Sequence, residues 1–449
     1  MRWFLLLCVS CWVVACSQPQ TSQEIPTSSE QQSQNDAAEG NDAGATEPSA
    51  SQETTKEELP DSSEPAPEQS EPESEAPKEI AALTFSAPTK WAAPIEDYIA
   101  VGKKKKPDMN FLRGIHDMVV YLDRLYIGYG DANINLGRDT PIAFRYFPSP
   151  DETKVVSEFN SDEEQLDRYR ILGTSLFMAG IDATEDAWLG NVYIKEGKEK
   201  WLKSRTLQGG VHVHDCVLYQ DKPFCVGSGA KQAEWKQGKI FAHLWSSDDK
   251  GKSFQIVHRR QNPNRGDARW VRLLPQAKWL FVFGYQTNAQ GQINSLNNSV
   301  YDGKTVTPIQ SGSLLLSQVL VSETDIISPT LGLLRGVNVV KTPLRNVFLR
   351  MQDGKNPVPI EEFKDQTVLD IFTHKASGES IILSHDNSLY NDVRNLKSWD
   401  VHVWRTEQFK HFTKMMSFTT QRPPKSIAYW KGSLYFGDQW GEVWRSTGK

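Results

Sequence analysis

The stretch that decides the fold is Gly209–Phe254, which begins GGVHVHDCVLYQDKPFCVGSGA and ends IFAHLWSSDDKGKSF. Apolar residues gather on both sides of Gln220-Asp221, which predicts two strands joined by a tight turn. Ile240–Trp245 predicts a third strand, and Phe254 begins a fourth. Four short antiparallel strands in about 50 residues are typical of one blade of a β-propeller.

The same two-strand pattern recurs along the chain at a spacing of about 50 residues. The other copies lie at 118–128, 170–180, 271–284, 318–328, 368–384 and 426–437. Third strands are expected after them at 143–147, 191–195, 242–245, 299–303, 338–342, 401–406 and 442–446. Because one such sheet has open edges and is marginal alone, the repeats are expected to pack radially. The fold class predicted is all-β, a seven-bladed β-propeller over 81–449.

The last repeat reaches Lys449 after its third strand. We expect Ala82–Ala93 to supply the missing outer strand and so to close the ring. Trp91 then takes the place of the aromatic residue found in the other fourth strands.

The N-terminal part has a different composition from the rest. Residues 1–15 have one basic residue and an apolar core too short to span a bilayer, which predicts a signal peptide. Residues 17–80 hold 16 acidic residues, two lysines and no aromatic residue, so 16–80 is expected to be a disordered tether. The whole chain carries −6 and the tether −14. The body after the tether therefore carries a small net positive charge. That charge is spread over too many residues to favour nucleic acid as a partner.

Val13-Val14-Ala15-Cys16 resembles a bacterial lipobox, in which cleavage precedes a cysteine that becomes lipidated. The resemblance implies a cell-envelope lipoprotein held to the membrane by lipid on Cys16. Ser17 after the cysteine favours the outer membrane. Whether the protein lies on the periplasmic face or the surface face of that membrane stays open. A plain signal peptide is the alternative.

Cys216 and Cys225 are the cysteines left for the body. Folding the hairpin about Gln220-Asp221 places Cys216 opposite Cys225, where a disulfide can form in an oxidising compartment. Two free buried thiols are the alternative.

One turn carries a family resemblance. Ser247, Asp249, Gly251, Ser253 and Phe254 match the Asp-box of sialidase-like (BNR) propellers. Physically, the carboxylate accepts backbone N–H groups in a tight turn, Gly251 supplies a positive φ and Phe254 packs behind. In that family the box marks the fold and carries no chemistry.

The residues expected at the functional face lie where first strands begin and second strands end. They are His116, Asp117, Asp131, Asp182, Trp188, His214 and Asp215. Since neighbouring strand residues point to opposite faces, the His and Asp of one pair are not expected to face the channel together. A ligand-binding rim, a metal site, and residues that only hold the blades in register remain open as hypotheses.

The function predicted is a monomeric binding module for a glycan or an envelope protein, with no cofactor and no metal. A sialidase-like glycoside hydrolase or lyase is the first alternative. Arg170-Ile171-Leu172 lacks the proline of the sialidase Arg-Ile-Pro signature, which speaks against that activity. An envelope assembly scaffold is the second alternative. A Ser-His-Asp constellation also stays open, because its members need not be close in sequence.

Overall fold

The computed structural model describes most of the chain after residue 83. The described residues are 84–105, 114–131, 142–185, 188–262, 266–276, 278–289, 293–296, 298–308, 314–316, 320–321, 325–333, 348–352, 358–364, 366–374, 378–386, 398–407 and 411–449. The predicted signal peptide, Cys16 and the tether lie outside them. None of the described helices is both long and apolar enough to cross a bilayer.

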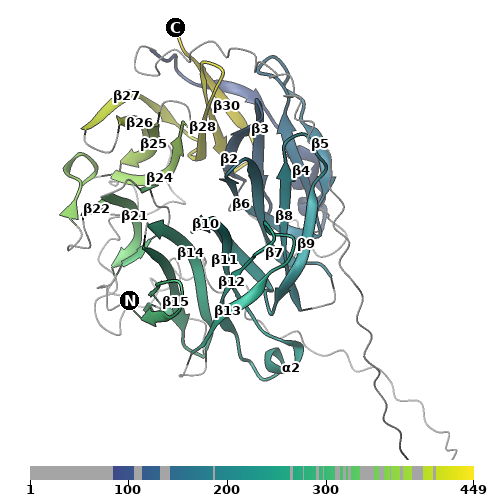
Figure 1. Ribbon diagram of the computed structural model, residues 1–449. Helices are drawn as coiled ribbons and strands as arrows, with labels where there is room; N and C mark the ends of the chain where they lie inside the picture. The colour runs from purple at the N-terminus through teal and green to yellow at the C-terminus, as the bar shows by residue number, and fades with distance from the viewer. Residues whose placement is uncertain are drawn as a thin grey trace, which may run out of the picture. The chain divides into compact units, whose positions relative to one another are not determined.

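The described body is all-β, built from antiparallel sheets that follow one another along the chain (Figure 1). The first sheet has the order β2 (Ile115–Tyr121), β3 (Arg124–Tyr129), β4 (Ala143–Phe147), β5 (Val156–Asn160). The next is one long sheet that contains two such groups. They are β6 (Glu163–Leu172), β7 (Ser175–Ala183), β8 (Leu189–Glu196) and β9 (Leu202–Gln208), then β10 (His212–Tyr219), β11 (Lys222–Gly229), β12 (Phe241–Ser246) and β13 (Gln255–Gln261). The two groups meet where His212 of β10 pairs with Ile181 of β7.

The remaining sheets repeat this plan with local variations. One holds β14 (Ala268–Gln276), β15 (Trp279–Thr287), β16 (Ile293–Leu296), β17 (Ser299–Tyr301) and β18 (Val306–Pro308). Another holds β19 (Leu314–Leu316), β20 (Leu320–Val321), β21 (Asp325–Leu333), β22 (Phe348–Gln352) and β23 (Val358–Pro359). The predicted third strand at 338–342 lies outside the described residues, and β22 pairs with β21 in that role. A further sheet holds β24 (Gln366–Thr373), β25 (Glu379–Asp386), β26 (Trp399–Glu407) and β27 (His411–Thr420).

The last sheet combines both ends of the described chain, as predicted. It has the order β28 (Pro424–Trp430), β29 (Ser433–Asp438), β30 (Val443–Thr447), β1 (Thr89–Ala92). Trp91 of β1 packs its ring 4.4 Å from that of Phe147 and 5.0 Å from that of Tyr435. One tryptophan therefore joins the first sheet to the last.

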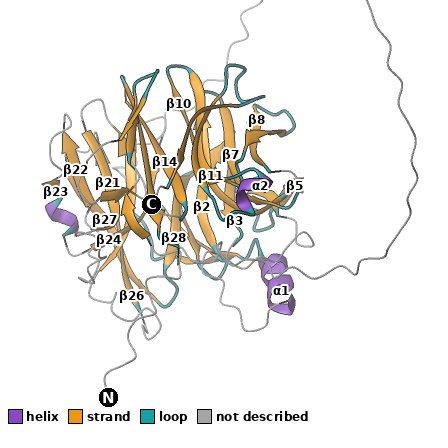
Figure 2. Cartoon of the chain, turned by 90° about the horizontal axis from the view of Figure 1, so that it is seen from below, coloured by secondary structure: helices purple, strands orange, loops and turns teal. Residues whose placement is uncertain are grey.

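The first strands of successive groups lie side by side, and we call them the inner strands. Contacts run from β2 to β6, β6 to β10 and β10 to β14, and from β24 to β28 and β28 to β2 (Figure 1). This arrangement is propeller-like. Sequence analysis missed two α-helices, α1 (Glu96–Lys105) and α2 (Gln232–Trp235), and the 3-10 helix η4 (Glu361–Phe363), all of which Figure 2 shows beside the strands.

The hairpin at the centre of the prediction has the expected register. Val217 pairs with Phe224 and Cys216 with Cys225, and the two turn residues have φ of 50° and 60°. Cys216 and Cys225 are disulfide-bonded with their Cα atoms 4.1 Å apart, a separation typical of the closer, non-hydrogen-bonded type of cross-strand pair. Free thiols are thus excluded in this structure.

Candidate functional site

Three aspartates on inner strands make the same contact with the next inner strand. One carboxylate oxygen of each of Asp117, Asp215 and Asp370 accepts a backbone N–H. The donors are Tyr169, Leu273 and Ile427, at 2.7, 3.1 and 2.7 Å. The residues before those donors are Arg168, Arg272 and Ser426. Aspartate and arginine therefore alternate at equivalent positions along β2, β6, β10 and β14, and a serine takes the place of the arginine on β28.

Ser426, on the last inner strand, contacts the first inner strand. Ser426 of β28 donates its hydroxyl to the backbone oxygen of Ile115 on β2, at 2.9 Å. These contacts fit the hypothesis that Asp117 and Asp215 hold the sheets in register, and both carboxylates are engaged in them.

A β-bulge precedes the contact on each of these strands, and it corrects one expectation. The pairing shifts between Ile115 and Asp117 on β2, which leaves His116 as the extra residue. His116 Nε2 lies 2.9 Å from the backbone oxygen of Leu166, and Asp117 binds β6 as well. Simple alternation predicted opposite directions for this pair. The bulge breaks the two-residue period, so both side chains reach the same neighbour.

The environments of Asp117 and Asp215 differ in charge. Burial raises the pKa of Asp117 to about 7, although Arg168 opposes the shift. Burial also acts to raise the pKa of Asp215, but the nearby guanidinium groups of Arg170 and Arg272 outweigh it and hold that pKa below its usual value. Arg170 Nε donates to Asp215 Oδ1 at 2.9 Å. His214 is the extra residue of the equivalent bulge on β10, and its ring stacks 5.8 Å from that of His212.

Asp131 is buried at the end of the first hairpin. Its backbone N–H donates to the hydroxyl of Tyr98 on α1 at 3.1 Å. The structure therefore places Asp131 against α1. Its neighbour Gly130 pairs with Gln165, which in turn pairs with Ile181, the residue before Asp182.

Asp182 lies at the end of β7 with φ of 60°, in the left-handed region. Its Oδ1 is 2.5 Å from Nε2 of His212, and His212 Nδ1 is 3.3 Å from the hydroxyl of Ser228. Ser228 is 0 % and His212 2 % exposed. This is a Ser-His-Asp array, but its serine is sealed from solvent.

A buried carboxyl lies beside this array. Glu163 is 1 % exposed; its Oε1 accepts from Asn191 Nδ2 and from the hydroxyl of Tyr193, the latter at 3.0 Å. Its Oε2 has no hydrogen-bond partner among the described residues. Burial raises the pKa of Glu163 to about 8 against those hydrogen bonds, and Asp182 adds to the rise. The carboxyl packs on Gly180, where an added Cβ would lie 2.4 Å from it.

Charged side chains connect Glu163 to the surface. Glu185 accepts from Asn191 Nδ2 at 3.0 Å and pairs with Lys203 and Arg205, both at 2.6 Å. Arg205 also donates to Asn191 Oδ1 at 2.9 Å. The cluster is thus a network in which a protonatable carboxyl is covered by ionised groups.

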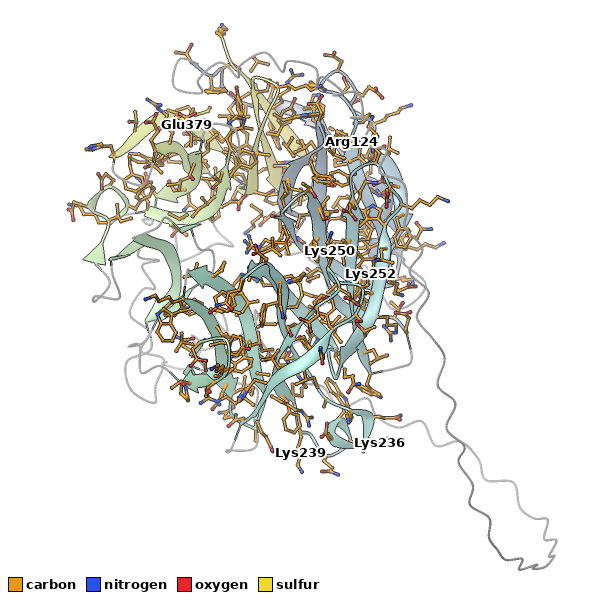
Figure 3. The ribbon with its side chains drawn as sticks, viewed as in Figure 1. Arg124, Lys236, Lys239, Lys250, Lys252 and Glu379 are labelled. Carbon is orange, nitrogen blue, oxygen red and sulfur yellow. A yellow bond between two sulfur atoms is a disulfide. The ribbon has the colours of Figure 1, made fainter. Side chains whose placement is uncertain are left out.

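An aromatic pair adjoins the network. The half-buried rings of Trp188 and Trp235 lie 5.1 Å apart at 38°. Trp235 is the last residue of α2, which is fastened by two hydrogen bonds from Arg259 to Glu234. Lys236 and Lys239, which follow α2, point away from the sheets (Figure 3).

The turn at 209–211 brings the aromatic pair and the network together. Gly209 N donates to the backbone oxygen of Trp188 at 3.0 Å, and Asp182 N donates to that of Val211 at 3.3 Å. Of the residues predicted for the rim, Asp182 and Trp188 therefore share one site. We call Asp182, Glu185, Trp188 and Trp235 the aromatic rim site.

The turn Ser247–Phe254 has the geometry expected for it. Asp249 Oδ1 accepts Ser253 N at 2.8 Å, and Ser247 Oγ accepts Gly251 N at 2.7 Å. Gly251 has φ of 91°, and Phe254 is buried. The hydrogen bond from the Ser253 hydroxyl contributes most to holding the pKa of Asp249 at about 2. The turn joins β12 to β13, away from the aromatic rim site in sequence.

Among the described residues, no cluster of three or more His, Cys, Asp or Glu could hold a metal ion.

Sequence analysis missed several residues of the site. Trp235 lies in a helix that no pattern predicted, and Glu163, Asn191 and His212 were not singled out. The only available signal for His212 was its place at the start of a first strand, two residues before His214.

Comparisons with known proteins give fold-level similarity alone. No family model matches the chain, and no curated protein matches its sequence. A catalytically inactive virginiamycin B lyase from Staphylococcus aureus with quinupristin is similar at 10% identity and TM-score 0.41, covering 76% of this chain and 96% of that one. The β-propeller domain of the Trilobed protease from Pyrococcus furiosus is similar at 10% identity and TM-score 0.43, covering 72% and 90%.

A GH74 xyloglucanase from Xanthomonas campestris is similar at 10% identity and TM-score 0.45, covering 81% of this chain and 53% of that one. We draw no inference about ligand or reaction from these similarities.

Proposed function

We propose that this chain is a lipid-anchored protein of the bacterial cell envelope, and that its body is a seven-bladed β-propeller of the Asp-box type. The described strands fall into groups that begin with β2, β6, β10, β14, β19, β24 and β28, which supports the blade number. The disulfide supports an oxidising compartment, as the lipobox resemblance at Cys16 implies.

The body binds a glycan through the aromatic rim site. The observation that carries this proposal is the half-exposed Trp188–Trp235 pair, which the turn at 209–211 connects to Asp182. Glu185, three residues before Trp188, is paired with Lys203 and Arg205. Aromatic faces supply apolar contact to a sugar ring, while a few fixed polar groups orient its hydroxyls. Asp182 and Glu185 are placed to accept from hydroxyls, and Lys203 and Arg205 to donate to them.

Asp117 and Asp215 drop out of the proposed ligand contacts, because their carboxylates hold neighbouring inner strands. His116, His214 and Asp131 are left as positions around the inner strands with no ligand role in the proposal. The protein acts as a monomer in this account.

The test exposes the chain to a panel of bacterial and host glycans and scores retention and released sugar together. Retention without product supports the proposal. Released product contradicts the binding-module proposal and favours a glycoside hydrolase or lyase. If neither retention nor released sugar is found, the result favours the scaffold hypothesis, which pull-down from envelope extract then tests.

One observation favours the hydrolase as the second candidate. Glu163, with its pKa raised to about 8, holds a proton at neutral pH, as a general acid must, beside the carboxylate of Asp182. Its exposure of 1 % places it out of reach of a substrate in this conformation, which ranks this candidate second. If the protein is a hydrolase, Glu163→Gln abolishes product release. If the protein only binds glycans, Glu163→Gln leaves glycan retention unchanged.

A further inference from the structure

A second Ser-His-Asp array lies in the sheet β24 to β27, far in sequence from the aromatic rim site. His402 Nδ1 is 2.8 Å from the hydroxyl of Ser417, and His402 Nε2 is 2.8 Å from Oδ1 of Asp386. Each residue comes from a different strand, namely β27, β26 and β25. One imidazole thus connects a hydroxyl to a carboxylate at hydrogen-bonding distance on both sides.

The register of the sheet explains why these groups meet. His402 pairs directly with Ser417 on one side and with Ser384 on the other. Asp386 follows Ser384 by two residues, so it lies on the same face of the sheet. The array is therefore fixed by strand pairing on a rigid element, as a nucleophilic site requires.

Exposure separates this array from the one at the rim. In the rim array, Ser228 is 0 % exposed, and no reagent reaches its hydroxyl. Ser417 is an exposed residue, while the side chain of Asp386 is 40 % and that of His402 11 % exposed. The same three residue types thus occur in a rim array whose serine is buried and in a second array whose serine is exposed to solvent.

We propose that Ser417 is a nucleophile activated by His402, with Asp386 orienting the imidazole, and that it takes an acyl group from an ester. The chemistry follows from the roles of the groups. The imidazole accepts the hydroxyl proton as the Ser417 oxygen bonds to the ester carbonyl carbon, and the carboxylate stabilises the imidazolium that forms. The ester C–O bond then breaks, the imidazolium gives its proton to the departing alcohol, and the acyl group stays on Ser417. This activity goes beyond the proposed glycan binding and does not depend on it.

The position of β27 supplies donors for the charge that develops on the attacked carbonyl. In the described sheet β27 is the outermost strand. An edge strand turns alternate N–H groups away from its partner, so either Ser417 or its two neighbours offer such a group. Backbone N–H groups of this kind are the usual donors to a tetrahedral oxyanion.

A fluorophosphonate is the direct probe of this serine. The Ser417 oxygen forms a bond to phosphorus, the P–F bond breaks, fluoride leaves and the hydroxyl proton passes to His402. We expect the full chain to gain one phosphonyl group, located on Ser417 by peptide mass spectrometry.

Variants separate an activated serine from one that is merely exposed. Ser417→Ala should lose the label, and His402→Gln should slow labelling at least 100-fold, the size of a general-base contribution. Ser157→Ala is the matched control. Ser157 is exposed on the outer strand β5 and pairs with Arg145 instead of a histidine, so its loss should change nothing.

Two results overturn the proposal. One is the absence of labelling on Ser417 under conditions that label a known serine hydrolase. The other is a labelling rate in His402→Gln equal to that of the unaltered chain. A circular dichroism spectrum and unfolding midpoint for each variant identify any loss of folding. If His402→Gln unfolds, the labelling rate of His402→Asn decides the case.

Discussion

Asp215 contacts both neighbouring inner strands, β6 and β14. Its carboxylate is fully buried, pairs with Arg170 and accepts the N–H of Leu273. Asp215→Asn should lower the free energy of unfolding by about 3 kcal/mol, because removing one partner of a buried pair leaves the other uncompensated. Urea unfolding at neutral pH measures the loss.

The Lys222–Asp248 pair is the matched control, since both of its side chains are 57 % exposed. Asp248→Asn should leave the free energy of unfolding nearly unchanged. Equal losses for the two variants would show that Asp215 does not join the sheets.

Glu163 makes stability depend on pH with a definite sign. Its pKa is about 8 in the folded chain and near 4.5 when unfolded, so between these values the folded state holds one more proton. The free energy of unfolding from this group should therefore fall as the pH rises from about 5 to 8 and level off above that range. Glu163→Gln should flatten the profile by about 1.4 kcal/mol per pH unit in the middle of the range. Unfolding curves at half-unit pH steps check this, and an unchanged slope in the variant would contradict it.

Single residues of the site were only partly predictable. Asp182 and Trp188 follow a second strand, so their position along the repeat pointed to the rim. Glu163 and Asn191 gave no signal, because a buried carboxyl and its amide partner come from different strands and only the folded sheet brings them together. The bulges at His116 and His214 insert one residue with no glycine or proline at that point of the bulged strand, and the glycines that face them, Gly128 and Gly227, lie on the partner strands.

Hairpins were the best predicted elements. Turn residues such as Gln220-Asp221 fix the register, and the register placed Cys216 opposite Cys225. The helix α2 escaped prediction because four residues, Gln232–Trp235, are too few to show a helical period.

The disulfide should account for a measurable part of the stability of its hairpin. Replacing Cys216 and Cys225 together with alanine should lower the free energy of unfolding by about 2–3 kcal/mol, from the lost constraint on a short loop. Reduction of the unaltered chain should give a similar loss. If dithiothreitol leaves the unfolding midpoint unchanged, the bridge does not stabilise the body.

The joining of the two ends of the described chain was predictable from the repeat, because the last copy lacks a fourth strand. Trp91 is the residue that makes this joint apolar, through Phe147 and Tyr435. Trp91→Ala should lower the free energy of unfolding by about 3 kcal/mol, within the range for large-to-small changes in a packed site. Trp440→Ala is the control, because the Trp440 side chain is exposed. A loss no larger than that of the control would mean that β1 does not hold the first and last sheets together.

The proposed binding of a glycan at the aromatic rim site is tested most directly by comparing two tryptophans. Retention on the glycan panel is measured for the unaltered chain, Trp188→Ala and Trp279→Ala. Trp279 is 44 % exposed on β15, outside the site. We predict that Trp188→Ala weakens retention about tenfold, the equivalent of one aromatic contact, and that Trp279→Ala retains the glycan fully. Equal retention by both variants would contradict the proposed site.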